Sequence, residues 1–498
     1  MLWFFICVAL LVAGYFLYSR VIENIFGIRP ERQTPAYAMQ DGIDYVPMSK
    51  KRIWLIQLLN IAGTGPIFGP ILGALYGPVA MLWIVFGCIF AGAVHDYLTG
   101  MLSIRNGGAN LPFLAGKYLG NPFKHFMNIL AVVLLLLVGV VFVASPASLL
   151  TNITMDLTST GTVGAAAVND EAGASKGTIL AVWTAIIFVY YIIATLVPID
   201  KIIGRVYPIF GALLLFMTVG MFYGLIANDI AFFRTIGTDI GLVDFFKNMH
   251  PENLPIWPIL FVTIACGAIS GFHATQTPLM ARCAENEKEA RFIFYGAMIA
   301  EGVIALIWCM VGLSFYDSQA DLVEALKGTP SKVVYDSAVG MLGIVGGTLA
   351  VLGVVILPIT SGDTAFRAAR LMLAEWFNIE QRTLAKRLMI AIPLFVIGFL
   401  VSKVDFQILW RYFGWANQTT AMITLWVVSA YLLSVRKFHW VSTIPAVFMT
   451  MICSSFILNA KIGLNLDYQL SVWLGIASGI IALLVFLKMI KPTRAEEA

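Results

Sequence analysis

The stretch Ile53-Trp-Leu-Ile-Gln-Leu-Leu-Asn60-Ile-Ala-Gly63-Thr64-Gly65-Pro66-Ile-Phe-Gly69-Pro70 decides the fold class, because it is an apolar helix interrupted at its centre. Glycine and proline both weaken the interior of a helix. At membrane depth such a break persists only where protein or a water-filled cavity satisfies the freed backbone groups. Since proline suits the first turn of a helix, the sequence predicts that a second half-helix begins near Pro66.

A second stretch has the same character. Cys266-Gly267-Ala-Ile-Ser270-Gly271-Phe-His273-Ala-Thr275-Gln-Thr277-Pro278 interrupts the apolar run that begins at Trp257. The free N–H groups at the start of a half-helix favour an anion, most simply a carboxylate. The alternative is that these glycines only let helices approach closely. The predicted substrate-binding residues are Asn60, Gly63, Thr64 and Gly65 at the first break, and Gly267, Ser270, Gly271, His273 and Thr275 at the second.

The composition around these breaks is that of a membrane protein. The chain has 498 residues, of which 59% are hydrophobic and 12% charged, whereas soluble domains carry about 25% charged residues. Apolar residues form blocks near the length of about 20 residues that a spanning helix needs. We therefore predict an all-α polytopic membrane protein with about thirteen spans, near 1–18, 53–75, 78–102, 125–149, 178–197, 205–226, 256–280, 292–315, 340–364, 385–402, 407–434, 439–459 and 468–490.

The two broken spans are five positions apart in this order. Five is an odd number, so the second set of five helices enters the membrane from the opposite side, which is the pattern of an inverted repeat. The predicted parts are an extra helix with a cytoplasmic loop (1–52), a first five-helix repeat (53–226), an external loop (227–255), a second five-helix repeat (256–434), and two further helices with a cytoplasmic tail (435–498).

The basic residues predict the orientation. With the loop after the first span in the cytoplasm, 24 of the 32 Lys and Arg residues fall in cytoplasmic segments, as the positive-inside rule requires. We expect a multi-pass protein of the plasma (inner) membrane, with its N-terminus outside and its C-terminus in the cytoplasm. The net charge of +4 needs no nucleic-acid partner, because the basic side faces anionic lipids. A homo-oligomer stays open.

Several ionisable residues lie within predicted spans. Because a charged side chain is costly inside the bilayer, each of them calls for a structural or functional explanation. His273 either contacts the substrate or a proton, or is a buried histidine bonded to a carbonyl that the break frees. Asp96, which follows His95, either relays a proton or anchors its helix against Arg105. Glu301 is interpreted as a packing partner of a neighbouring helix.

Asp363 follows Thr360 and Ser361 and precedes Thr364 in the ninth span. These four residues and Asp96 are the predicted ion- or proton-coupling residues. The carboxyl of Asp363 could carry a proton, and the neighbouring hydroxyl groups could instead offer oxygens to a cation. A third possibility is that Asp363 merely pairs with Arg367 at i+4.

Two motifs resemble the carbon starvation protein A family. They are Asn60-Ile-Ala-Gly-Thr-Gly-Pro-Ile-Phe-Gly-Pro-Ile-Leu72, continuing to Phe90-Ala-Gly-Ala-Val-His-Asp96 and Ser103-Ile-Arg105-Asn-Gly-Gly, and Thr263-Ile-Ala-Cys-Gly-Ala-Ile-Ser-Gly-Phe-His273, continuing through Ala290-Arg-Phe-Ile-Phe-Tyr-Gly-Ala-Met298. The resemblance covers most of residues 50–460 and implies a LeuT-type five-plus-five fold. It also implies uptake of peptides or pyruvate during nutrient limitation, with H⁺ as the coupling ion and Na⁺ as the alternative.

Other function classes lack their signals. No Gx4GK[ST], HExxH or GxSxG motif is present, so we predict neither an ATPase nor an enzyme, and no cofactor. The six cysteines form no CxxC pair, so neither a structural metal site nor a disulfide framework is predicted. The predicted function is a symporter for a small solute that bears a carboxylate: a peptide, an amino acid or pyruvate. The alternatives are a nutrient sensor or a channel.

Overall fold

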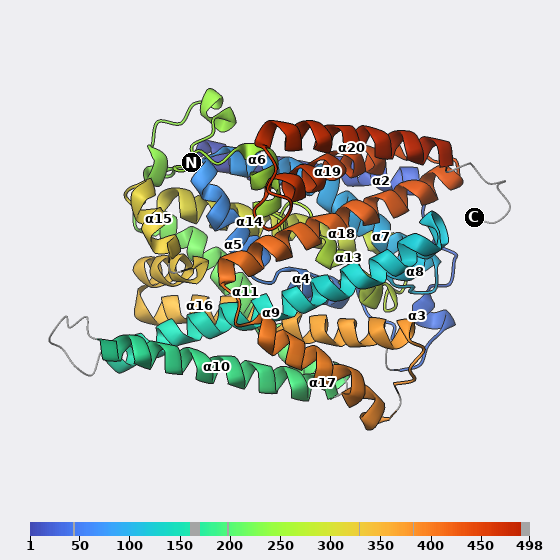
Figure 1. Cartoon of the computed structure of the whole chain (residues 1–498), viewed down its shortest axis with the longest axis horizontal. Helices are drawn as coiled ribbons and strands as arrows, with labels where there is room; N and C mark the ends of the chain where they lie inside the picture. The colour runs from blue at the N-terminus through green and yellow to red at the C-terminus, as the bar shows by residue number, and fades with distance from the viewer. Residues whose placement is uncertain (43–44, 160–169, 197–198, 328, 382, 490–498) are drawn as a thin grey trace. The chain divides into compact units, whose positions relative to one another are not determined.

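The fold is built from helices, as Figure 1 shows for the computed structural model. The structure describes residues 1–42, 45–159, 170–196, 199–327, 329–381 and 383–489. Within those residues there is no β-strand, and one isolated bridge joins Met48 to Ala284. The all-α prediction is confirmed.

The count of spans needs one refinement. Ten helices in the described residues are long and apolar enough to cross a membrane, and the bent pair Lys50–Ile61 and Gly65–Tyr76 makes eleven. The two other predicted spans are 256–280, which the structure divides into short helices, and 407–434, which carries many polar residues. Thirteen is therefore an approximate number, because helical breaks and polar faces blur the hydropathy signal.

The chain divides into two compact units. The first unit contains Met1–Leu134, Asp239–Met310 and Trp410–Ala498. Its principal helices begin with the N-terminal pair and end with α19 and α20, which lie side by side at the top of Figure 1. Their bounds are α1 Leu2–Ala13, η1 Gly14–Tyr18, α2 Ser19–Phe26, α3 Pro35–Ala38, α4 Lys50–Ile61, α5 Gly65–Gly73, η2 Ala74–Tyr76, α6 Val79–Gly87, η3 Cys88–Gly92, α7 Ala93–Arg105, α8 Leu111–Leu119, η5 Leu242–Phe246, η6 Ile256–Leu260, α12 Phe261–Thr263, α13 Gly271–Ala281, η7 Glu287–Glu289, η8 Arg291–Tyr295, α14 Gly296–Ser314, α18 Phe406–Ser434, α19 Trp440–Asn459 and α20 Tyr468–Met489.

The second unit contains Leu135–Thr238 and Val311–Leu409, so α9, α14 and α18 each contribute residues to both units. Its elements are most of α9 Asn121–Ser159, then α10 Asp170–Leu196, α11 Ile199–Ala227, η4 Arg234–Ile236, α15 Gln319–Lys327, α16 Pro330–Trp376 and α17 Leu384–Val401. The long α16 is kinked at Gly343, where φ is +68°. The boundaries of the two predicted repeats stay a prediction, and residues 160–169, 197–198, 328 and 382 of these repeats lie outside the described residues.

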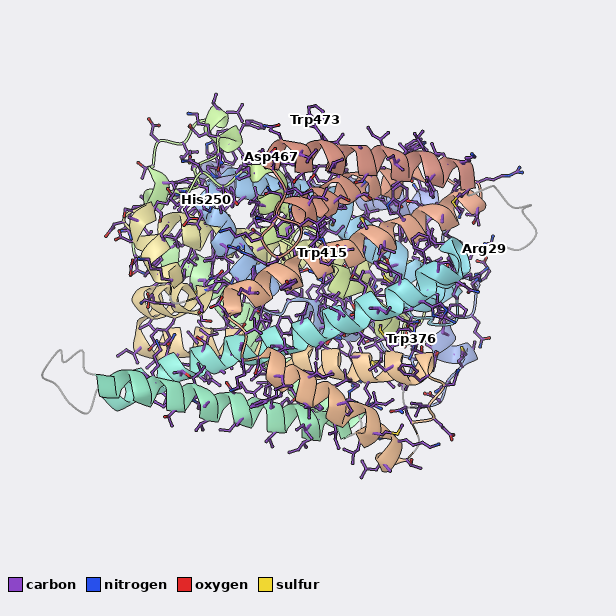
Figure 2. The ribbon with its side chains drawn as sticks, viewed as in Figure 1. Arg29, His250, Trp376, Trp415, Asp467 and Trp473 are labelled. Atoms are coloured by element: carbon purple, nitrogen blue, oxygen red, sulfur yellow. The ribbon has the colours of Figure 1, made fainter. Side chains whose placement is uncertain are left out.

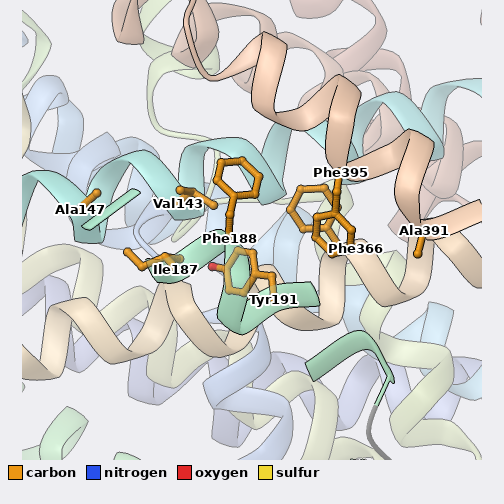
Figure 3. Close-up of a cluster of buried hydrophobic side chains, with 8 residues drawn as sticks. All are labelled: Val143, Ala147, Ile187, Phe188, Tyr191, Phe366, Ala391 and Phe395. Atoms are coloured by element: carbon orange, nitrogen blue, oxygen red, sulfur yellow. The ribbon is translucent and has the colours of Figure 1, made fainter. Parts of the chain in front are cut away.

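An aromatic cluster forms the core of the second unit. Figure 3 shows that Phe188 and Tyr191 of α10 face Phe366 of α16 and Phe395 of α17. The Tyr191 hydroxyl donates to the carbonyl of Phe142 (2.9 Å) or that of Pro358 (3.0 Å). A buried tyrosine needs such a partner for its hydroxyl, and here the partners tie α10 to α9 and α16.

Both predicted helix breaks are present in the first unit. At the first break α4 ends at Ile61 and α5 begins at Gly65, with a bend of 50° between them. At the second, α12 ends at Thr263 and α13 begins at Gly271. The sequence motifs rich in glycine and proline therefore mark these breaks correctly.

Candidate functional site

The two helix breaks pack directly against each other. A Cβ atom added at Gly65 would lie 2.3 Å from Cys266 Sγ and 2.4 Å from Cys266 Cβ. At Gly69 an added Cβ would lie 3.0 Å from the carbonyl oxygen of Thr263. Glycine is thus required where the start of α5 meets the second break. These glycines let the two breaks approach closely, and the same contact holds the two broken helices together.

The second break has its own glycine constraint. Gly267 adopts φ of +89°, a backbone conformation that other residues rarely adopt, and an added Cβ there would lie 2.5 Å from Ala305 Cβ on α14. Ser270 is extended and precedes the first turn of α13. The chain therefore turns tightly through 264–270 and presents the N-terminus of α13 inside the protein.

Asn417 of α18 caps that N-terminus. Its Oδ1 atom accepts hydrogen bonds from the backbone N–H of Phe272 at 2.7 Å and from the Ser270 hydroxyl at 3.2 Å. A polar side chain in this position satisfies donors that the helix leaves free. Asn417 is not among the residues predicted from the sequence, because it lies inside α18 and reaches α13 only through tertiary packing.

Asp96 and His273 meet in the interior of the first unit. His273 Nδ1 lies 2.8 Å from Asp96 Oδ2, and His95 Nδ1 lies 2.8 Å from Asp96 Oδ1. All three side chains are fully buried. The two histidines thus occupy both oxygens of one carboxylate, and α7 is linked to α13. The interpretation of His273 as a partner of a freed backbone carbonyl is wrong for its Nδ1 atom, which faces a carboxylate instead.

Two further interpretations concern Arg105 and Glu301. Arg105 does not anchor Asp96; its guanidinium pairs with Glu287 at 2.9 Å, because the end of α7 faces η7. Glu301 does contact a neighbouring helix, since Oε2 lies 3.3 Å from His273 Nε2 and the side chain is fully buried. A histidine is therefore held between two carboxylates that come from α7 and α14.

The other residues predicted at the breaks differ in their surroundings. The Thr64 hydroxyl is buried and makes no hydrogen bond. The Thr275 hydroxyl donates to the carbonyl of Phe272 at 2.6 Å and accepts from Gln276 Nε2 at 3.1 Å, so it is engaged within α13. Asn60 is 2% exposed, and an added Cβ at Gly271 would lie 2.3 Å from the carbonyl oxygen of Asn417. Gly63 donates its N–H to Ile61 at 2.9 Å.

The predicted coupling residues on α16 belong to the second unit. Asp363 Oδ1 lies 3.6 Å from Arg367 Nη2, a distance within an ion pair but too long for a hydrogen bond. The hydroxyls of Thr360 and Thr364 donate to carbonyls one turn earlier, at Leu357 (2.8 Å) and Ser361 (2.9 Å). Hydroxyls that donate in this way keep their oxygen lone pairs available for a cation.

Comparison with known proteins agrees with this architecture. The family model described as carbon starvation protein CstA matches residues 1–169, 162–339 and 334–455. A Haemophilus influenzae membrane protein is 65% identical over 351 residues, covering 66% of this chain and 94% of the relative. The Escherichia coli peptide transporter CstA is 27% identical, covering 91% of this chain and 80% of the relative. The Escherichia coli pyruvate/proton symporter BtsT is 31% identical, covering 60% of this chain and 47% of the relative.

Solved transporters share the fold. A closed structure of the nucleobase-cation-symport transporter Mhp1 with bound bromovinylhydantoin aligns with a TM-score of 0.54 and 15% identity, over 94% of this chain and 98% of that one. A structure of MhsT with L-phenylalanine aligns with a TM-score of 0.55 and 16% identity, over 88% of this chain and 98% of that one. Both have the LeuT-type fold, which confirms the predicted fold class.

Proposed function

This chain belongs to the carbon starvation protein CstA family, and we propose that it is a symporter that takes up a small carboxylate-bearing nutrient, a peptide or pyruvate. The observation that carries the proposal is the pair of helix breaks at Ile61–Gly65 and Thr263–Gly271, buried and packed on each other in the first unit. In transporters of this architecture, half-helix ends at the breaks bind the substrate. The relatives named peptide transporter and pyruvate/proton symporter supply the two substrate classes.

The substrate carboxylate docks at the half-helix N-termini. The start of α5 offers the backbone N–H of Gly65 beside the buried, unbonded hydroxyl of Thr64, because Pro66 has no N–H and those of Ile67 and Phe68 donate to the Thr64 carbonyl. The start of α13 offers further backbone N–H groups, although the N–H of Phe272 already donates to Asn417 Oδ1. The positive end of each helix dipole favours an anion there. Asn60, Gly63, Gly267, Gly271 and Thr275 shape the two breaks rather than supply charge.

The coupling ion is H⁺, and Asp363 carries it. Its carboxyl is partly buried, with 15% of the side chain exposed, and its Oδ1 atom lies 3.6 Å from Arg367 Nη2. Such a carboxyl gains and loses a proton more readily than one locked in a short bidentate pair. Na⁺ is the alternative, held by hydroxyl oxygens of Thr360, Ser361 and Thr364. Asp96 contributes by orienting His273 and needs no change in its own protonation.

The decisive experiment is uptake into proteoliposomes of the purified full chain. Labelled pyruvate and a labelled dipeptide are compared under an imposed proton gradient, a sodium gradient, or neither. We expect one substrate to accumulate above equilibrium under the proton gradient alone. Accumulation under the sodium gradient alone would transfer the coupling to Na⁺, and equilibration that no gradient drives would favour a channel. Binding of a substrate without any uptake would favour a nutrient sensor.

The role of Asp363 has a separate test. In Asp363→Asn the proton-driven accumulation should disappear while exchange of labelled for unlabelled substrate persists, because exchange needs no net proton movement. Asp336→Asn is the matched control on the same helix, where the carboxylate pairs with Lys332 at 2.7 Å. Wild-type accumulation in Asp363→Asn would remove Asp363 from the coupling step. A response to carbon starvation is tested by transcript and protein levels after carbon depletion.

A further inference from the structure

Three different ligand atoms converge beside the second helix break. Cys266 lies in the break, His273 in the first turn of α13, and Glu301 on α14. Cys266 Sγ, a ring nitrogen of His273 and a carboxylate oxygen of Glu301 all lie within 4.8 Å of one another. The three residues are 3%, 0% and 0% exposed. Sulfur, imidazole nitrogen and carboxylate oxygen are the usual ligands of zinc in proteins.

Hydrogen bonding accounts for only part of this arrangement. Cys266 Sγ has hydrogen-bond contacts with Ser270 and Asn417. His273 Nε2 and both carboxylate oxygens of Glu301 are buried and make no hydrogen bond of good geometry, although the Gly267 backbone and the Cys266 thiol lie near them. Nε2 and Oε2 lie 3.3 Å apart, whereas a charged N–H···O bond is about 2.7–2.9 Å long. Two ligands about 2.0–2.2 Å from a tetrahedral zinc ion lie about 3.4 Å from each other. The spacing therefore fits two atoms that share a metal ion better than two atoms that share a proton.

The outer contacts of the cluster orient its ligands. Asp96 Oδ2 lies 2.8 Å from His273 Nδ1, so the Nδ1–H faces the carboxylate and the Nε2 lone pair faces Cys266 and Glu301. This carboxylate–histidine arrangement is typical behind a metal-bound histidine. Cys266 Sγ donates to the Ser270 hydroxyl at 3.5 Å and accepts from Asn417 Nδ2 at 3.7 Å, so Asn417 supplies a donor that can also serve the thiolate formed when a metal binds. Asp96 is itself held by His95 at 2.8 Å.

The charges of the ligands also favour a cation. A buried carboxylate and a buried thiolate are costly in the membrane interior unless a cation neutralises them. A dication would neutralise Glu301 and the Cys266 thiolate, while the Asp96 carboxylate stays paired with His95 and His273 at 2.8 Å. We propose that Cys266, His273 and Glu301 bind one divalent transition-metal ion of the zinc class, oriented by Asp96. Binding releases the proton of the Cys266 thiol to solvent.

The donor set distinguishes the ion. A thiolate with one imidazole and one carboxylate selects zinc and its neighbours in the transition series, and disfavours Mg²⁺ and Ca²⁺, which prefer oxygen ligands. Three protein ligands leave the fourth position of a tetrahedral ion open. That position would accept a substrate carboxylate, a detail that rests on the proposed function, whereas the metal site itself does not.

The test measures metal directly. The chain is purified in detergent with a tag free of histidine, and its metal content is determined by inductively coupled plasma mass spectrometry. Co²⁺ is then titrated into chelator-treated protein, and absorption from a cobalt–thiolate bond is recorded. We expect about one ion per chain in the wild type and the thiolate band with Co²⁺. Wild-type protein with no more metal than Cys266→Ser, and with no thiolate band, would overturn the proposal.

Variants locate the site. Cys266→Ser should abolish the band, Asp96→Asn should weaken Co²⁺ affinity roughly 10–100-fold, and Glu301→Gln, which removes a ligand, should weaken it further. Cys309→Ser, another buried cysteine on α14, is the matched control and should retain both band and affinity. If Cys266→Ser does not fold, removal of metal from the wild type by chelator, and its return, supply the same answer. Wild-type protein that transports substrate but binds no metal would overturn only the metal site. Wild-type protein that binds metal but transports neither substrate would leave the metal site standing and contradict the proposed function.

Discussion

At Gly65 the contact between the two breaks leaves no space for a single methyl group. Gly65→Val should lower the free energy of unfolding by about 1–3 kcal/mol, because an added Cβ would overlap Cys266 Sγ at 2.3 Å. It should also slow uptake, since the start of α5 would be displaced. Thermal unfolding in detergent and proteoliposome uptake measure the two effects. Gly296→Ala, whose nearest neighbour would be at 3.4 Å, is the control, and a fully active Gly65→Val would exclude the proposed substrate site.

His250 should make the folded protein sensitive to acid. It lies before η6, where Figure 2 labels it, and its ring packs 4.6 Å from that of Tyr76. Nδ1 accepts the backbone N–H of Glu252 at 3.2 Å. Burial lowers the pKa of His250, against a smaller raising effect of the Glu252 carboxylate. The unfolded chain therefore binds more protons, so this stability is present above about pH 6.5 and is lost as the pH falls below it.

The measurement is the melting temperature between pH 7.5 and 5.5. His250→Gln should remove part of the acid-induced decrease that the wild type shows. His125→Gln, at an exposed position of α9, should melt with the wild-type pH dependence. Identical profiles for the wild type and His250→Gln would contradict the assignment.

Among the elements, α13 depends on a cap from a distant helix. Asn417→Ala should cost about 1–3 kcal/mol, because the N–H of Phe272 would stay buried without its 2.7 Å partner. Hydrogen exchange of the first turn of α13 and the melting temperature should both report the loss. Asn417→Asp retains an acceptor, so the amide hydrogens in the first turn of α13 should exchange more slowly in this variant than in Asn417→Ala. Thr424→Val, which removes only a bond within α18, is the control. Unchanged exchange in Asn417→Ala would disprove the cap.

A buried ion pair joins four segments of the first unit. Arg105 at the end of α7 donates to Glu287 at 2.9 Å, to the carbonyl of Gly27 at 2.6 Å and to the Tyr431 hydroxyl at 3.1 Å. Glu287 also accepts the N–H of Arg29 at 2.7 Å. Arg105→Gln should cost about 3–5 kcal/mol, because it leaves Glu287 charged and buried. In a double-mutant cycle the loss in Arg105→Gln/Glu287→Gln should be smaller than the sum of the single losses; additive losses would show that the pair is not coupled.

The sequence predicts the breaks of these elements better than their partners. Glycine and proline act on their own backbone, so the interruptions near Gly63 and Gly267 can be read locally. The pairing of Asp96 with His273 joins residues 177 positions apart, and no helical periodicity contains that contact. For the same reason the sequence does not identify His273 as the partner of Glu301, nor Cys266 as their neighbour, nor Asn417 as the cap of α13. A polar residue within a span signals that a partner exists, but tertiary packing selects the partner.

For the whole molecule, the distribution of basic residues makes orientation the property most directly open to test. Of the 32 Lys and Arg residues, eight lie in the segments predicted to be external: Lys176, Arg234, Lys247, Lys327, Lys332, Lys403, Arg411 and Lys461. Retention of the other 24 in the cytoplasm would produce the predicted topology, because translocating a basic loop is disfavoured. A green fluorescent protein fused after Ala498 should therefore fluoresce, while alkaline phosphatase fused there should be inactive.

Fusions within the predicted loops test the same topology at internal positions of the chain. Alkaline phosphatase fused after Gly237, in the predicted external loop 227–255, should be active, because this fusion point follows an even number of predicted spans from an external N-terminus. A fusion after Asn286, one span later, should be inactive. Reversed activities at both sites would invert the topology, and with it the side from which the half-helices at Gly65 and Gly271 receive the substrate. The alternation depends on counting the broken span 256–280 as one crossing, so equal activities at the two positions would show that its halves enter and leave on the same side.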